Sequence, residues 1–264
     1  MYADDTVIYF HSKDFRTIEK NLTENFILLS NWLEKNELIL NVEKGKTEVM
    51  LFGTKQKLCK VEDDLNITHR FEKLNNTKSY KYLGVKLDPS LNFIDHFDFV
   101  YRKASGRVRY LKKIRHNLTN RATLQIFQSL IVPILTYCSL LNYSLQLHRK
   151  NLLKYLEFRA LNLLSNRSHK VPSIENLNKR KSCIFVHKCI QGRMNNFENY
   201  FDIIQHNINT RNNSTLIRLP RVKLQSTKRA FFFQGGLEFN KLPVNIRRIN
   251  DTKIFCNEVK KFLS

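Results

Sequence analysis

The sequence predicts an α+β fold whose strands lie near the N-terminus and whose remainder is mainly helical. Short runs of β-branched and aromatic residues, typical of strands, occur in the first hundred of the 264 residues. After them, apolar residues recur at steps of three and four, which is typical of amphipathic helices. Seven glycines and five prolines are too few for a collagen-like or loose linker protein. We therefore expect compact domains with cores of their own.

The strands are predicted at residues 6–10, 48–52 and 80–87. The first is expected to be buried and to follow a turn at Asp4 and Asp5. The third contains Gly84, and a glycine within a strand suggests a bulge or a close approach of another backbone. A helix is predicted at about 17–33, between the first two strands, and Asp14 falls at its start.

The rest of the chain predicts a series of helices. They are expected from near Asn92 through Leu111, and at about 121–135, 149–164, 174–200 and 252–263. Thr119 is a candidate N-cap for the second of them, and Pro133 should kink or end it. Residues 206–215 are rich in Asn, Ser and Thr, which indicates a linker. A buried stripe is expected on the first helix, made by Ile94, Phe97, Tyr101, Ala104, Val108 and Leu111.

The charge of the chain is strongly positive and regional. Lys and Arg number 45 against 23 Asp and Glu, a net charge of +22. Residues 1–100 are nearly balanced, whereas residues 101–170 hold 14 basic side chains and one acidic side chain, Glu157. Such a field repels itself unless an anion is bound, and the phosphate backbone of a nucleic acid is the usual partner. The predicted nucleic-acid contacts are Arg102, Lys103, Arg107, Arg109, Lys112, Lys113 and Arg115.

Cysteine usage and hydropathy favour an intracellular protein that does not cross a membrane. The five cysteines are odd in number and include no Cys-x-x-Cys pair, which suits free thiols in a reducing compartment. The N-terminus does not have the pattern of a signal peptide. No apolar run is long enough for a membrane span, so we expect no membrane partner.

Tyr2-Ala3-Asp4-Asp5, followed by an apolar strand, is the sharpest chemical motif. Nucleotide polymerisation uses two divalent metal ions that hold the attacking and leaving oxygens, and Mg²⁺ prefers carboxylate and water ligands. Carboxylates at a turn between strands provide a rigid platform for such ions. Because neighbouring strand residues point to opposite faces, Asp4 and Asp5 are not expected to be equal ligands.

The order of the motifs resembles the palm of reverse transcriptases. Tyr2 to Thr6 resembles the catalytic hairpin, and the segment from Asn41 through Lys46 to Gly53 resembles the next palm segment. Tyr82-Leu83-Gly84-Val85-Lys86-Leu87-Asp88 resembles the segment that holds the primer end. The basic helices from Tyr101 resemble the thumb. Residues 128–138 are similar to a thumb-region segment of jockey-like non-LTR retrotransposon polymerases. The block from Thr210 to Pro243 resembles the C-terminal domain of the same proteins.

The resemblance implies a partial palm at 1–100, a helical basic thumb at 101–170 and a small C-terminal domain at 171–264. In an intact parent the reaction would be RNA-templated DNA synthesis from a DNA primer and deoxynucleoside triphosphates with Mg²⁺. Asp4 would be the main metal ligand, Asp5 its partner, and Tyr2 would lie near the primer end. Lys46 would lie near the triphosphate, where a solvated lysine is an equal alternative, and Leu83 and Gly84 would form the primer-gripping turn. The family's cellular locations are the nucleus or a cytoplasmic ribonucleoprotein.

The sequence departs from the family before Tyr2, because the fingers and a further palm aspartate are not found there. We therefore expect a truncated chain that is inactive alone, with an unpaired apolar strand at 6–10 and an unstable first hundred residues. The alternatives are a basic nucleic-acid-binding protein without catalysis, a relic without a role, and a group II intron maturase-like fragment, which shares the hairpin. The block from Thr210 to Pro243 favours the retrotransposon over the maturase.

Two further motifs favour a structural role. Cys183, His187 and Cys189 have the wrong spacing for the usual zinc fingers and fit an amphipathic helix. Residues Phe231 to Phe233 could stack on nucleic-acid bases, but we expect them in a core.

Overall fold

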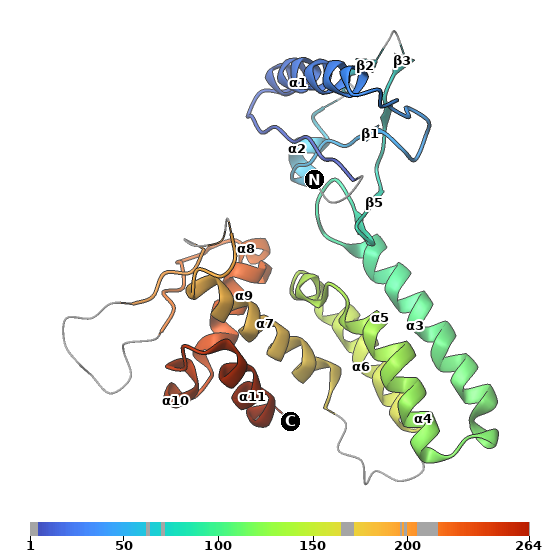
Figure 1. Cartoon of the computed structure of the whole chain (residues 1–264), viewed down its shortest axis with the longest axis vertical. Coiled ribbons are helices and arrows are strands. Elements are labelled where there is room, and N and C mark those ends of the chain that lie inside the picture. The colour runs from blue at the N-terminus through green and yellow to red at the C-terminus, as the bar shows by residue number, and fades with distance from the viewer. Residues whose placement is uncertain are drawn as a thin grey trace. The chain divides into compact units, whose positions relative to one another are not determined.

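The computed structural model describes residues 5–61, 64–69, 72–164, 172–195, 197, 200–204 and 216–263. The chain forms two compact units, Met1–His96 and Phe97–Ser264. The fold is α+β and mainly helical, as the sequence predicts, with short strands in the first unit and helices in both (Figure 1). The predicted linker at 206–215 lies outside the described residues.

The described residues of the first unit form one long helix, one short helix and three small pairs of strands. Its helices are α1 (Phe15–Lys35) and α2 (Lys55–Leu58), and its strands are β1 (Glu48–Val49), β2 (Thr68–His69), β3 (Glu72–Lys73), β4 (Asn75–Asn76), β5 (Tyr80–Tyr82) and β6 (Val85–Leu87). β1 pairs with β4 in parallel, whereas β2–β3 and β5–β6 are antiparallel pairs. The buried core of the unit comprises Phe26, Val49, Leu65, Ile67 and Leu74.

Asp14 begins α1 as an N-cap. Its carboxylate accepts hydrogen bonds from the Thr17 backbone N–H, at 2.8 Å, and from the Thr17 hydroxyl, at 2.7 Å. These hydrogen bonds lower the pKa of Asp14. The predicted helix is therefore confirmed, with bounds two residues longer at each end.

The prediction of a buried strand at residues 6–10 is wrong. The structure has no strand there, and the side chains of Val7, Ile8, Tyr9 and Phe10 are exposed. Composition alone predicted the strand, but β-rich residues become a strand only where another backbone pairs with them. The predicted strand at 48–52 is also shorter, since only Glu48 and Val49 pair with a neighbour.

The prediction of one strand at 80–87 is wrong as well, because the segment is a hairpin. β5 and β6 pair with Tyr82 opposite Val85, which leaves Leu83 and Gly84 as a two-residue loop. Both loop residues have positive φ, 45° for Leu83 and 80° for Gly84. That is the pattern of a type I′ turn, whose twist matches the twist of the flanking strands. The turn implied by the resemblance is thus present, and Gly84 serves it rather than a bulge.

Asp88 organises the entry to the long helix α3 (Ile94–Ile114). This buried carboxylate accepts hydrogen bonds from the backbone N–H groups of Ser90, Asn92 and Phe93. Leu91 and Phe93 in the same loop have positive φ. The hydrogen bonds to this carboxylate therefore stabilise a loop whose backbone conformation is otherwise unfavourable.

The second unit continues from α3 through a series of helices. They are η1 (Arg115–Asn117), α4 (Asn120–Ile126), η2 (Phe127–Ile131), α5 (Val132–Thr136), η3 (Ser139–Tyr143), α6 (Leu147–Leu161), α7 (Ile174–Ile190), α8 (Gln225–Arg229), α9 (Phe231–Asn240), α10 (Val244–Arg247) and α11 (Thr252–Phe262). The predicted stripe of α3 is confirmed in the core by Phe97, Ala104, Val108 and Leu111. Ala104, Val108 and Leu111 pack in one cluster with Phe127, Ile131 and Leu156.

Pro133 perturbs the helix that contains it, as predicted. Residues Phe127–Ile131 form a π-helical turn just before it, and the Val132 N–H donates to the Phe127 carbonyl five residues back. Proline has no N–H to donate, so a wider turn is one way to absorb the missing bond. The N-cap prediction for Thr119 is also confirmed, since its hydroxyl accepts the Ala122 N–H at 3.2 Å.

A second core cluster lies in the C-terminal part of the unit. α7 packs against both α9 and α11, and the buried residues include Val186 and Phe201 together with Phe239, Phe255 and Val259. Phe231 and Phe232 are half-buried and pack against this cluster, in agreement with the expected core role. No helix of the described residues is long and apolar enough to cross a membrane.

Candidate nucleic-acid interface and palm site

The predicted catalytic residues are only partly covered by the structure. Tyr2 and Asp4 lie outside the described residues, whereas Asp5 is described and exposed. Lys46 is exposed on the loop before β1, in which Gly45 has a φ of 86° and donates its N–H to the Glu48 carboxylate.

Tyr80 contacts Lys46 and lies close enough to Asp5 to feel its charge. Its hydroxyl donates to the Lys46 carbonyl at 3.2 Å. Burial raises the pKa of Tyr80, and the negative charges of Asp5 and Glu48 raise it further. Two predicted site residues therefore surround a tyrosine that the sequence analysis did not select. Tyr80 lies just before the Tyr82-Leu83-Gly84 motif, but nothing in its spacing reveals that it lies near Asp5.

The described part of the chain does not contain a complete metal site. No group of three or more His, Cys, Asp or Glu side chains is arranged there to hold a metal ion. Asp5 offers one carboxylate, and Glu48 uses an oxygen to accept the Gly45 N–H at 2.9 Å. The described residues alone therefore do not fit a two-metal site of the polymerase type.

The cations of α3 fall into two groups. Arg102, Lys103, Arg107, Arg109, Lys112 and Lys113 are exposed, and none forms an ion pair with a carboxylate among the described residues. No acidic residue occurs between Asp98 and Glu157 to neutralise them. The helix thus presents a positive surface whose counter-charge must come from another molecule or from solvent ions.

Arg115 differs from the other six cations. Its guanidinium is half-buried and donates to the carbonyl oxygens of Leu163 and Leu118, the latter at 2.7 Å, and to the Asn120 side chain. The Leu163 carbonyl lies just after the end of α6, and the Leu118 carbonyl just after the end of η1. The last carbonyl groups of a helix have no partner within the helix, so they are free to accept from a side chain. Arg115 is therefore engaged in holding the end of α3 near the end of α6, which leaves fewer of its donors for phosphate.

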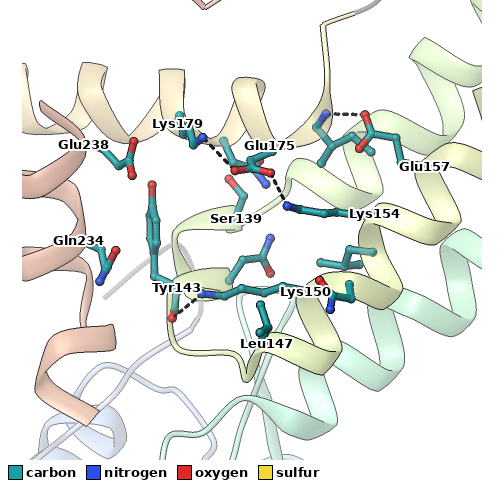
Figure 2. Close-up of a pocket in the computed structure, with 15 residues that line it drawn as sticks. Ser139, Tyr143, Leu147, Lys150, Lys154, Glu157, Glu175, Lys179, Gln234 and Glu238 are labelled. Carbon is teal, nitrogen blue, oxygen red and sulfur yellow. Dashed lines mark hydrogen bonds and ion pairs between the residues drawn. The ribbon is translucent and has the colours of Figure 1, made fainter. Parts of the chain in front are cut away.

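A cavity of about 250 Å³ lies within the second unit, between η3, α6, α7 and α9 (Figure 2). Glu175 on its wall forms ion pairs with Lys154, at 2.8 Å, and with Lys179, at 2.9 Å. Hydrogen bonds from Lys154 and Lys179 lower the pKa of Glu175 to about 2. Glu157 accepts the Ile174 N–H at 2.7 Å, and burial raises its pKa. No local pattern in the sequence marks this cavity, because its residues come from four separate elements.

The buried His187 and Cys183 belong to the C-terminal core. The His187 ring stacks on Phe255 with 4.0 Å between centroids, and its Nε2 donates to the Ile249 carbonyl at 2.7 Å. Burial raises the pKa of Cys183 to about 12. Both side chains thus serve packing, which is the role that the amphipathic pattern predicts.

Two comparisons with known proteins place the sequence. The chain is 27% identical, over 139 residues and 52% of its length, to the RNA-directed DNA polymerase from mobile element jockey of Drosophila melanogaster. It is 22% identical, over 145 residues, to the Retrovirus-related Pol polyprotein from type-1 retrotransposable element R1 2 of Nasonia vitripennis. The chain spans 14% and 34% of the length of these two relatives. No family model matches the chain, and no solved structure matches it.

The two relatives come from the class of element that the motifs resemble. Both are polymerase-bearing proteins of mobile elements, and each match covers 52% of the chain. This homology over about half of its length makes the chain a relative of the reverse transcriptases of non-LTR retrotransposons.

Proposed function

We propose that this chain is part of a non-LTR retrotransposon RNA-directed DNA polymerase and that it binds the template–primer duplex. The duplex would consist of the RNA template and the DNA primer. The observation that carries the proposal is the exposed face of α3, where six cations have no carboxylate partner among the described residues. Phosphate contacts of this kind supply affinity and fix position without reading sequence.

The outermost row of α3 suits a close approach of a nucleic-acid backbone. Arg102, Gly106, Arg109 and Lys113 follow one another at steps of four, three and four, and therefore share one face. This row lies opposite Ala104, which is fully buried. A Cβ built on Gly106 meets no atom within 4 Å, so packing does not explain the glycine. Glycine in a helix interior costs about 1 kcal/mol relative to alanine, and close approach of another backbone is one of its uses.

The catalytic part of the proposal rests on Asp4 and Asp5. A polymerase of this kind requires divalent cations, and carboxylate ligands suit Mg²⁺. Tyr2 would lie at the primer end, Lys46 at the incoming deoxynucleoside triphosphate, and Leu83 and Gly84 at the primer backbone. We propose that the chain by itself binds nucleic acid but does not polymerise. In a cell we would look for it in the nucleus or in a cytoplasmic ribonucleoprotein.

Binding is tested with an end-labelled RNA–DNA hybrid and fluorescence anisotropy between about 50 and 200 mM salt. The triple variant Arg102→Gln/Arg109→Gln/Lys113→Gln should weaken binding and flatten the salt dependence by roughly one unit of log–log slope for each lost phosphate contact. The matched control removes three exposed cations from the first unit, Lys35→Gln/Lys55→Gln/Lys57→Gln. Equal losses in the two triple variants would show that net charge, rather than the face of α3, binds the duplex.

Catalysis is tested by primer extension with the purified chain, the four triphosphates and Mg²⁺. We expect no extension. If the chain extends the primer and Asp4→Ala abolishes the extension, the proposal that the chain alone is inactive is wrong. The catalytic role proposed for Asp4 would then be supported. The second candidate function is a nucleic-acid-binding protein without catalysis, which the charge of α3 favours equally. Such a protein would also bind the hybrid without extending the primer.

A further inference from the structure

One face of α6 exposes aromatic rings that the core does not use. The helix packs into the second unit through Leu156 and Ala160, which are buried in one cluster with residues of α3, η2 and α5. Tyr155 and Phe158 lie outside this buried face and are 56% and 54% exposed. No aromatic ring of the described residues stacks on either of them. Packing within the unit therefore does not explain the two rings, and neighbouring exposed rings are typical of a binding surface.

Tyr155, Phe158 and Arg159 form one patch on this face. Residues three and four apart on a helix are neighbours on its surface, so Phe158 and Arg159 both flank Tyr155. The Arg159 guanidinium lies 5.9 Å from the centre of the Tyr155 ring, which is a cation–π distance. The two rings are separated by about 4.5 Å along the helix axis. The patch thus offers two exposed rings and one cation within about one turn of helix.

The charge around the patch is positive. Glu157 is the only acidic residue in the sequence of α6, and it is buried and accepts the Ile174 N–H away from the patch. Glu175 on the neighbouring α7 lies between Lys154 and Lys179 (Figure 2). Two ammonium groups and one carboxylate leave an excess of one positive charge there. The surroundings of the two rings therefore favour an anionic partner.

α6 runs alongside α3 and in the same direction. Near the beginnings of the two helices, the Arg149 guanidinium lies 5.7 Å from the centre of the Phe97 ring. At their ends, Arg115 donates to the Leu163 carbonyl. Tyr155, six residues after Arg149, is therefore level with the middle of α3 and its exposed cations. The patch lies on the helix next to the one that we propose binds the duplex.

We propose that the patch of Tyr155, Phe158 and Arg159 binds single-stranded nucleic acid, with unpaired bases stacked on the two rings. Every base has a π-face, so such stacking tolerates any sequence, and a cation beside the rings attracts the backbone. A duplex does not suit the rings, because its bases are already stacked on one another. The strand would be the unpaired extension of the template beyond the duplex on α3, and in that respect the inference rests on the proposed function.

The test uses the full chain and an end-labelled single strand of about ten nucleotides, in normal form and with abasic sites in place of the bases. Both strands carry the same phosphates, so stacking is what distinguishes them. Fluorescence anisotropy should show that the normal strand binds about tenfold more tightly than the abasic strand.

The variants separate the rings from the charge. Tyr155→Ala and Phe158→Ala should each weaken binding of the normal strand about tenfold and leave binding of the abasic strand unchanged. Tyr155→Phe and Phe158→Tyr keep a ring and should bind both strands as the parent chain does. Arg159→Gln should weaken binding of both strands by a similar factor. The matched control is Trp32→Ala on α1, which removes a ring that is 52% exposed and should change neither affinity.

Three results would overturn the assignment. The first is equal binding of the normal and abasic strands by the parent chain. The second is an equal effect of the ring variants and Trp32→Ala. The third is that the ring variants abolish self-association in sedimentation and leave strand binding intact, since the patch would then be an interface between two copies of the chain.

A blunt RNA–DNA hybrid separates this inference from the proposed function. The ring variants should bind the blunt hybrid as the parent chain does, whereas the triple variant of α3 should bind it more weakly. If the parent chain binds no hybrid but shows ring-dependent binding of the single strand, the duplex proposal fails and the stacking patch stands. Hybrid binding without ring-dependent binding of the single strand gives the reverse result.

Discussion

The side chain of Asn240 pairs with both backbone groups of Ile217. Its oxygen accepts the Ile217 N–H and its nitrogen donates to the Ile217 carbonyl, each at 2.9 Å. Ile217 is buried and lies in an isolated bridge with Ile203. The amide thus takes the place of a neighbouring strand on the other side of this segment and fastens the segment to the end of α9. This gives a structural reason for Asn240, which lies in the block from Thr210 to Pro243 that resembles the retrotransposon polymerases.

Asn240→Asp should destabilise the second unit by about 2 kcal/mol. The substitution keeps the shape but replaces the donor with a carboxylate oxygen, which faces the Ile217 carbonyl, and leaving a buried group unpaired costs about 1–3 kcal/mol. Urea unfolding followed by circular dichroism measures the change. Asn245→Asp on the exposed side of α10 introduces the same charge and should change stability by less than about 0.5 kcal/mol. Equal effects of the two substitutions would contradict this role for Asn240.

Gly235→Ala and Gly236→Ala should both destabilise the same core. A Cβ at Gly235 would lie 2.8 Å from the Phe231 ring, and a Cβ at Gly236 would lie 2.9 Å from the Leu219 side chain. Alanine favours a helix by about 1 kcal/mol over glycine, but overpacking of a core costs typically about 1–3 kcal/mol. We therefore expect a net loss in thermal unfolding. Gly106→Ala on α3 has open space and provides the control, because it should be stabilising by up to about 1 kcal/mol.

Periodicity predicted most of the long helices because each carries its own signal. The helix predicted at 174–200 is shorter, since α7 ends at Ile190, and α9 was not predicted as a helix. The stripe of α3 and the caps at Asp14 and Thr119 are local patterns that need no knowledge of the rest of the chain. The strands were predicted less well because a strand is defined by its partner, as residues 6–10 show. The approach of Tyr80 to Asp5 and Lys46, and the four elements around the cavity, depend on contacts between distant segments, which no local pattern contains.

Leu83→Asn should stabilise the first unit by about 1 kcal/mol. Leu83 has a φ of 45°, a conformation that costs an ordinary residue roughly 1–2 kcal/mol, whereas Asn-Gly is the preferred pair for a type I′ turn. Gly84→Ala should be destabilising for the same reason, because its φ is 80°. Hydrogen exchange of the β5 and β6 amides measures both changes. If Leu83 contacts the primer as proposed, Leu83→Asn should weaken hybrid binding while it strengthens the hairpin.

Amide exchange should be much faster in the first unit than in the second. Among its described residues, the buried core of the first unit comprises five side chains, and the strands are two or three residues long. Val7, Phe10, Ile27, Leu28 and Trp32 are exposed apolar side chains of the same unit. A unit with so little buried surface opens readily. Exchange in α1 as slow as in α7 would contradict this expectation.

The second unit should lose stability as the pH falls below about 6.5, the ordinary pKa of histidine. Burial lowers the pKa of His187, and the charge of Arg193 lowers it further, whereas the hydrogen bond to Ile249 and the charge of Asp251 oppose the shift. The unfolded chain therefore takes up the proton first, and its excess of bound protons makes stability rise with pH up to about 6.5 and level off above it. His187→Gln keeps a donor for the Ile249 carbonyl but does not titrate. Urea midpoints between about pH 5 and 8 should have a smaller slope in His187→Gln than in the parent chain. The exposed His148→Gln should retain the parent slope. An unchanged slope in His187→Gln would assign the pH dependence to other groups.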